Sequence, residues 1–164
     1  MSKRSLEQLI TKEISRVEYI GPLYHQKIDA VLAEAGTPPA SQLGTPLSLD
    51  VESGGEIAAF GAQYPDMVAA EPIIYKDSYY RNEDVVTAAL AEIGKGITVI
   101  REYAGPAIES LPPEKKFGLA TWLKIFPSSF RDRKYFLSVV AMSMEHLTEG
   151  GVMIASAFEN DSRT

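Results

Sequence analysis

The hydrophobic pattern of the first 35 residues predicts two amphipathic helices. Ser5-Leu6-Glu7-Gln8 is typical of a capping box at a helix start. The apolar positions behind it recur at helical spacing: Leu6, Leu9, Ile10, Ile14, Val17 and Ile20. Gly21-Pro22 interrupts the pattern, because proline cannot donate the next helical hydrogen bond. We therefore expect a break there and a second helix over 23–35, with Tyr24, Ile28, Val31 and Leu32 on one face.

The clearest periodic pattern begins at Asn82. The apolar residues that follow are spaced by alternating steps of four and three: Val86, Leu90, Ile93, Ile97, Ile100 and Ala104. Such a heptad seam predicts a helix that packs lengthwise against another helix. Gly94 and Gly96 inside it each cost about 1 kcal/mol relative to alanine. The β-branched run over 97–100 leaves a strand as the alternative there.

Two more helices are expected in the C-terminal third. The segment 114–126 is apolar around most of its circumference, which predicts a helix that is central in the core or covered by a partner. Ser129 then caps a last helix that ends at Gly150-Gly151. Residues 152–158 form an apolar terminal strip, and 159–164 are expected to be a disordered tail.

Residues 37–72 break the helical pattern. Prolines and glycines punctuate this segment, and only 56–64 resembles a short helix. Its charged residues are all acidic and account for most of the net charge of −6: Asp50, Glu52, Glu56, Asp66 and Glu71. We interpret it as an irregular acidic excursion over the surface, followed by a short strand or extended arm near 73–80. The predicted fold is mainly α, a single-domain bundle of about five to six helices over 1–158.

Composition narrows the class of protein. With 164 residues, 45% of them hydrophobic, the chain suits one globular domain. The absence of cysteine excludes disulfides, thiolate metal sites and cysteine nucleophiles. The polar N-terminus has no apolar stretch typical of a signal peptide, and the longest nearly apolar run, 137–144, is too short to cross a bilayer. We therefore expect a cytoplasmic protein with no membrane contact, and its acidity makes nucleic-acid binding unlikely.

Glu145, His146 and Glu149 form the one cluster that could hold a metal ion. Their spacing brings two carboxylates and an imidazole together on a helix, and such groups can bind a divalent cation if another segment adds ligands. A histidine in the last helical turn also interacts well with the helix dipole and the free carbonyls. The second interpretation is favoured, so no metal and no cofactor are predicted.

Two clusters combine aromatic with cationic side chains. Arg131, Arg133 and Lys134 alternate with aromatics over 130–136, where they could bind an anionic ligand or form the solvated face of a helix start. The second cluster contains candidates for partner binding, since tyrosine and arginine dominate interface hot spots: Tyr75, Tyr79, Tyr80 and Arg81. Its alternative role is to anchor a loop onto the helices.

No stretch of the chain matches a known catalytic or cofactor motif. The heptad seam, the apolar segment 114–126 and the tyrosine-rich arm favour a non-enzymatic helical assembly or protein-interaction module. Its partner would be another protein or a second copy of the chain. The alternatives are a small-molecule or metal-binding enzyme with a site built from scattered Asp, Glu, Tyr and His, or a weak nucleic-acid binder through 130–136.

Overall fold

Helices and strands alternate along the chain. The computed structural model describes residues 3–51, 54–72, 83–125 and 131–157. The elements in chain order are α1 (Lys3–Glu34), η1 (Ala40–Gln42), β1 (Pro46–Leu49), α2 (Gly55–Phe60), β2 (Val68–Ala70), α3 (Glu83–Ile93), β3 (Thr98–Ile100), α4 (Ala104–Glu109), β4 (Phe117–Ile125), α6 (Arg133–Glu145) and β5 (Leu147–Ala157). In this part of the chain, no helix is long and apolar enough to cross a membrane.

The strands form one parallel sheet in the order β3-β2-β1-β4-β5. Leu47 of β1 pairs with Val68 on one side and with Ala120 on the other. All four residues of β1 are buried, as expected for a parallel strand covered on both faces. From β1 the chain first builds the sheet toward β3 and then returns to build it toward β5. The order therefore reverses between β1 and β4.

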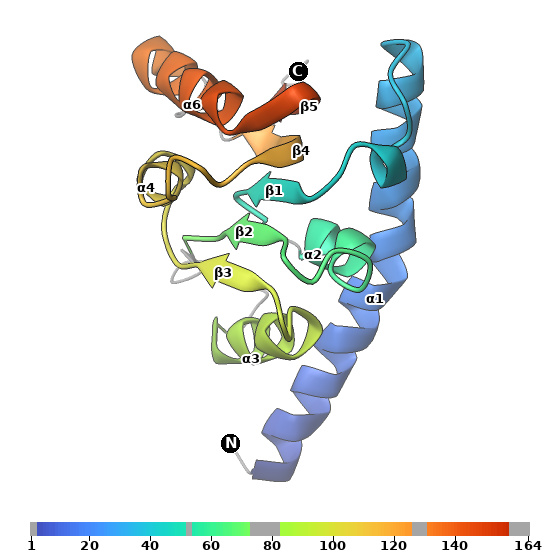
Figure 1. The fold of residues 1–164 in the computed structure, drawn as a ribbon. Coiled ribbons are helices and arrows are strands. Elements are labelled where there is room, and N and C mark those ends of the chain that lie inside the picture. The colour runs from blue at the N-terminus through green and yellow to red at the C-terminus, as the bar shows by residue number, and fades with distance from the viewer. Residues whose placement is uncertain (1–2, 52–53, 73–82, 126–130, 158–164) are drawn as a thin grey trace, which may run out of the picture.

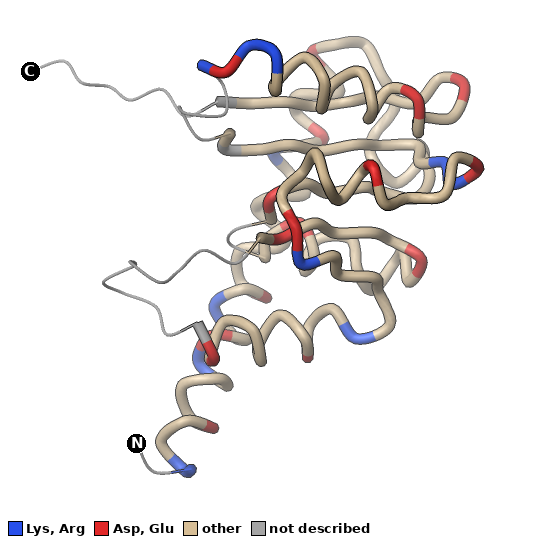
Figure 2. Tube along the Cα trace, turned by 90° about the vertical axis from the view of Figure 1, so that its left-hand side faces the viewer, with Lys and Arg blue, Asp and Glu red and all other residues tan. Residues whose placement is uncertain are grey.

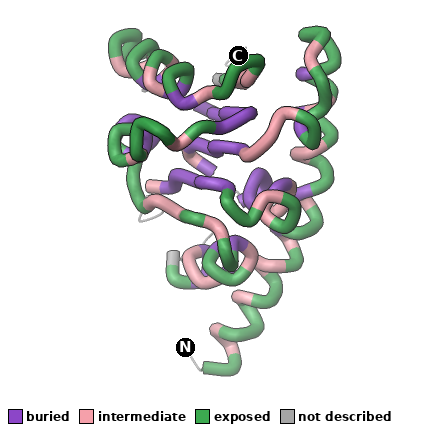
Figure 3. The backbone as a smooth tube through the Cα atoms, viewed as in Figure 1, coloured by how far each residue is buried: buried purple, intermediate pink, exposed green. Residues whose placement is uncertain are grey.

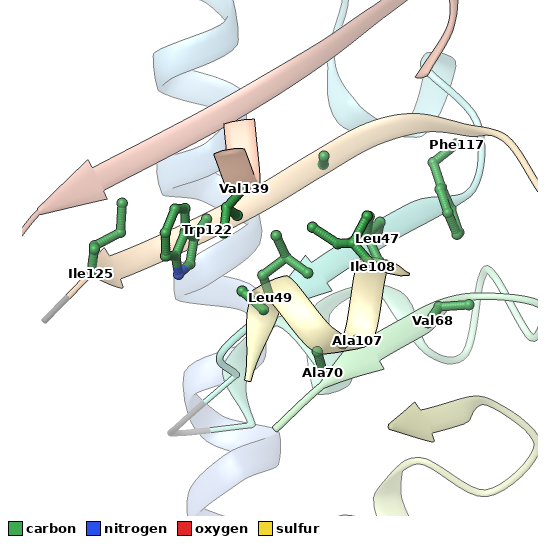
Figure 4. Close-up of a cluster of buried hydrophobic side chains, with 12 residues drawn as sticks. Leu47, Leu49, Val68, Ala70, Ala107, Ile108, Phe117, Trp122, Ile125 and Val139 are labelled. Atoms are coloured by element: carbon green, nitrogen blue, oxygen red, sulfur yellow. The ribbon is translucent and has the colours of Figure 1, made fainter. Parts of the chain in front are cut away.

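Helices cover both faces of the sheet, and each face has its own hydrophobic core. α1, α2 and α3 lie on one face, and α4 and α6 lie on the other (Figure 1). The strands are mostly buried, whereas the outer sides of the helices are exposed (Figure 3). Trp122 is fully buried in the core under α4 and α6, where Figure 4 shows it near Val139 and Leu49. The result is a three-layer α/β arrangement.

The predicted helical bundle is wrong. β1 and β2 lie inside the segment 37–72, which was interpreted as an irregular surface excursion. The segment 114–126, predicted as an apolar helix, contains β4. A continuous apolar run is equally typical of a strand buried on both faces, and periodicity alone does not separate the two.

The predicted heptad seam is also wrong beyond Ile93, where α3 ends. The chain then turns through Gly96, whose φ of 95° is in the region that favours glycine, and enters β3. The strand alternative for 97–100 is therefore the correct one. Residues 152–157 of the predicted apolar terminal strip belong to β5, while Phe158 and the predicted tail over 159–164 lie outside the described residues.

α1 is continuous where a break was expected. It contains Pro22 in its interior and runs on to Glu34. Gly21 lies against α2, where a Cβ atom would approach the Cβ of Ala58 to 2.9 Å. The Gly-Pro pair therefore marks a close helix–helix contact and not a helix end.

Candidate functional site

Two acidic residues follow neighbouring strands at the carboxyl edge of the sheet. Asp50 comes directly after β1, and Glu71 comes directly after β2. Glu71 is only 3% exposed, and its backbone N–H donates to the carbonyl of Ile100 over 2.9 Å. Open α/β sheets bind ligands outside the carboxyl ends of their strands, where the strand order reverses. This edge is therefore the candidate site.

Asp50 is held in an unusual conformation by a partner on β4. Its φ of 51° makes it the one non-glycine residue with positive φ in the described part of the chain. The indole Nε1 of Trp122 donates to its Oδ2 over 2.7 Å. Its Oδ1 is buried and has no hydrogen-bond partner among the described residues. Because a buried acceptor without a donor costs free energy, this oxygen is suited to receive a donor from a ligand.

The environment of Asp50 opposes its ionisation. Burial raises the pKa of the carboxyl above its ordinary value, while the hydrogen bond from Trp122 and, to a smaller extent, the nearby backbone of Ala104 lower it. A positively charged ligand group would favour the ionised form, because opposite charges attract strongly where water is excluded. The site is therefore suited to a cation or to a hydrogen-bond donor.

Tyr135 of α6 completes the same cluster. Its hydroxyl accepts from the backbone N–H of Gly105 over 3.2 Å, and its ring packs edge-on against Trp122 with centroids 6.2 Å apart. Burial raises the pKa of Tyr135, and the negative charge of Asp50 raises it further. The hydroxyl is therefore protonated at neutral pH and keeps a proton to donate.

Closely packed glycines shape the turn between β1 and α2. Gly54 has φ of 70°, and a Cβ there would collide with a methyl of Leu90. A Cβ at Gly55 would collide with the ring of Tyr24. The backbone at Gly54 and Gly55 is thus pressed against α3 and α1, and neither position has room for a side chain.

The cationic candidates lie on the surface. Arg131, Arg133 and Lys134 are exposed at the start of α6 (Figure 2). Asp132 caps that helix by accepting from the N–H of Tyr135 over 3.1 Å. The predicted cap Ser129 and the candidates Tyr75, Tyr79, Tyr80 and Arg81 lie outside the described residues.

His146 binds a backbone carbonyl and not its acidic neighbours. Its Nδ1 lies 2.8 Å from the carbonyl oxygen of Lys115, and its ring is buried at the helix end, while Glu145 and Glu149 are exposed. Among the residues that the structure describes, no group of three His, Asp or Glu side chains could hold a metal ion. A cavity of about 470 Å³ lies beside His146, between α4 and α6.

Sequence analysis missed Asp50 and Glu71 as site residues. Both were assigned to the irregular acidic segment. The pattern that could have found them is a short, mostly apolar run that ends in an acid, as in Leu47-Ser48-Leu49-Asp50 and in Val68-Ala69-Ala70-Glu71. Two parallel strands with such ends bring their acids to one edge.

The comparisons with known proteins address the fold. No protein-family model and no curated relative matches the chain. The crystal structure of Streptomyces venezuelae DesVI is similar, with a TM-score of 0.51 and 15% sequence identity over all of this chain and 61% of that one. The chain has an α/β Rossmann-like fold. This likeness overturns the helical bundle and, with it, the interpretation as a non-enzymatic helical assembly module.

Proposed function

We propose that the chain is an enzyme that binds S-adenosylmethionine at the carboxyl edge of β1 and β2 and transfers its methyl group to an acceptor. The observation that carries the proposal is the position of Glu71. In Rossmann folds, an acidic residue about 20 residues after the glycine turn hydrogen-bonds the ribose hydroxyls of a nucleotide cofactor. Glu71 follows Gly54 by 17 positions, from 71 − 54, and is buried at the end of the adjacent strand.

The turn after β1 favours this cofactor over a dinucleotide. A dinucleotide site has the glycine pattern G-x-G-x-x-G, whereas this chain has Asp50-Val51-Glu52-Ser53-Gly54-Gly55. A pyrophosphate would bring two negative charges toward Asp50 and toward Glu56, which is itself buried in α2. The whole segment 37–72 supplies no lysine or arginine to offset them. S-adenosylmethionine instead carries a sulfonium and an ammonium, which an acidic site attracts.

The residues at this edge match distinct parts of such a cofactor. The Glu71 carboxylate is suited to accept from the ribose hydroxyls, and the buried Oδ1 of Asp50 is suited to accept from the ammonium group. In the reaction, a lone pair of the acceptor attacks the methyl carbon. The carbon–sulfur bond breaks with its electron pair going to sulfur, and the acceptor then loses its proton to solvent. Exclusion of water by Trp122 and Tyr135 would strengthen the interaction of Asp50 with the cationic cofactor.

We also infer a cytoplasmic location, which is compatible with the absence of cysteine.

Calorimetric titration with S-adenosylmethionine, S-adenosylhomocysteine and NAD tests the proposal. We expect the first two to bind and NAD not to bind. Glu71→Gln should weaken binding of S-adenosylmethionine by about tenfold, the loss expected for a charge-assisted hydrogen bond. The matched control is Glu109→Gln, because Glu109 is exposed at the end of α4, on the other edge of the sheet. Binding of NAD alone, or of none of the three to folded protein, would contradict the proposal.

A further inference from the structure

β5 presents an outer edge that nothing in the described part of the chain covers. It is the last strand in the sheet order and pairs with β4 on its inner side. Its segment 151–157 contains no lysine, arginine, aspartate, glutamate or proline. Natural sheet edges are usually protected by charges, prolines, bulges or a covering element. An uncharged edge of this length is therefore suited to pair with another strand.

The two glycines at 150 and 151 separate this regular segment from the start of β5. Gly150 has φ of 75°, and the pairing with β4 shifts in register between Phe117 and Leu119 at this point. From Val152 to Ala155, consecutive residues pair with Leu119 to Trp122 of β4, and the register shifts once more between Trp122 and Ile125, where β4 holds the extra residue. β5 itself therefore has no further inserted residue from Val152 to Ala157, and Ile154 lies in the stretch that pairs regularly with β4.

An apolar groove runs alongside this edge on the face that α1 covers. It has a volume of about 340 Å³ and lies between α1 and the last two strands, lined by Tyr24, Lys27, Ile28, Val31, Leu123, Ile154 and Ser156. Val31 is 47% exposed, and Leu23, two helical turns before it on the same face of α1, is 46% exposed. The apolar surface therefore extends from the strand onto the helix.

We propose that two copies of the chain pair through β5 as antiparallel strands, which joins two sheets into one of ten strands. A two-fold axis normal to the sheet relates the copies and keeps α1 of both on the same face. Directly opposed residues then share a face, so the axis passes through a residue position. With the axis at Ile154, that residue faces its own copy, and Val152 faces Ser156.

The strand carries no charge that would oppose a second copy. No charged residue lies within 151–157. The nearest one, Glu149, lies where β5 advances by only two strand positions between Leu147 and Val152, so its two copies would be roughly 13–26 Å apart at about 3.3 Å per residue, and like charges are not opposed. A charged peptide would find no complementary charge along this strand. A second copy instead supplies the same uncharged edge and the same apolar groove, so that Ile154 and Val31 of both copies would meet. The pairing does not depend on the proposed cofactor.

Because the chain has no cysteine, a single introduced cysteine reports the geometry directly. Ile154→Cys should form a disulfide-linked dimer under mild oxidation, since opposed residues have Cα atoms about 4.5–5.5 Å apart. Thr148→Cys is the matched control on the same strand, where the residue is exposed. Its two copies would lie roughly 13–26 Å apart along the strand, beyond the reach of a disulfide, so it should stay monomeric on a non-reducing gel.

Light scattering on the protein as it elutes from a size-exclusion column tests the association itself. We expect the unmodified chain to be a dimer and Ile154→Lys to weaken dimerisation at least tenfold. Leu137→Lys, on the exposed side of α6, should leave the dimer intact. A monomer at every concentration overturns the proposal, and so does equal cross-linking of the two cysteine variants. If Ile154→Lys fails to fold, the cysteine pair still decides.

Discussion

The indole of Trp122 on β4 and the carboxylate of Asp50 at the end of β1 are joined by a hydrogen bond of 2.7 Å. The two residues are 72 positions apart in the sequence, yet β1 and β4 are adjacent where the strand order reverses. The bond fixes one carboxylate oxygen and leaves the other, Oδ1, directed into a buried environment. The same pair therefore joins two strands of the sheet and presents the oxygen that is proposed to bind the cofactor.

Trp122→Phe should destabilise the fold. Phenylalanine can keep the stacking with Phe136, whose ring centroid lies 5.7 Å away, but it cannot donate to Asp50. Because a buried carboxylate would then lose a donor, we expect the free energy of unfolding to fall by about 1–3 kcal/mol. Urea unfolding measures it. Asp50→Asn is the control, because it retains an acceptor for the indole and tolerates the positive φ. An equal loss in both variants would argue against the hydrogen bond as the cause.

The stability of the unliganded protein should depend on the charge of Asp50. Burial raises its pKa in the folded state above the ordinary value of 3.8, so the folded state binds the proton more tightly than the unfolded state. The stabilisation from that proton is present at low pH and is lost as the pH rises through the raised pKa. Asp50→Asn should therefore be more stable than the unmodified chain at neutral pH, and the difference should shrink below pH 3.8. Thermal unfolding across this pH range measures it. A difference that does not change with pH would contradict the prediction.

Asp50→Asn should also weaken the binding of the cofactor. If Asp50 accepts from the cationic part of S-adenosylmethionine, Asp50→Asn removes the negative charge and should reduce affinity by about tenfold. Calorimetry at neutral pH measures the affinity. Asp66→Asn is the matched control, because Asp66 is exposed before β2 and accepts only from Thr45 among the hydrogen bonds of its side chain that the structure describes. Unchanged affinity in Asp50→Asn would remove Asp50 from the proposed site.

Gly21→Ala tests the close contact between α1 and α2 by the sign of its effect. In an exposed helix, this change stabilises by about 1 kcal/mol. Here the new methyl group would approach the Cβ of Ala58 to 2.9 Å, so we expect a loss of about 1–3 kcal/mol from overpacking. Adding Ala58→Gly should recover part of that loss beyond the sum of the single changes. Chemical denaturation of the four proteins gives the coupling energy, and a stabilising Gly21→Ala would show that the helices do not pack as described.

Helical periodicity in the sequence was informative where a helix is amphipathic. The apolar spacing over 6–35 anticipated α1, although not its continuity through Pro22. The pattern after Pro127 anticipated α6, but the predicted end at Gly150-Gly151 is wrong, because α6 ends at Glu145 and β5 begins at Leu147. The strands were missed for two physical reasons. β1 and β2 are only four and three residues long and lie among prolines and glycines, so no period can be read from them. β4 is buried on both sides and carries no alternation of polar and apolar residues.

The candidate site could not be predicted because its residues are close together in space but far apart in the sequence. Asp50 and Glu71 can be assigned to one site only when β1 and β2 are known to be adjacent parallel strands. Trp122 belongs to a segment that looked like a helix, so its indole had no assigned partner. The cationic cluster at the start of α6 was visible in the sequence, and it lies on the surface.

The central place of β1 has a consequence for how the chain folds. Ser48 accepts a buried 2.9 Å hydrogen bond from Thr121, which is 73 positions later. During synthesis, β1 cannot pair with β4 until β4 has left the ribosome, so the middle of the sheet forms late. Contacts this distant in sequence slow folding and expose unpaired strands to aggregation in the meantime. We therefore expect this chain to refold far more slowly than a helical bundle of equal length.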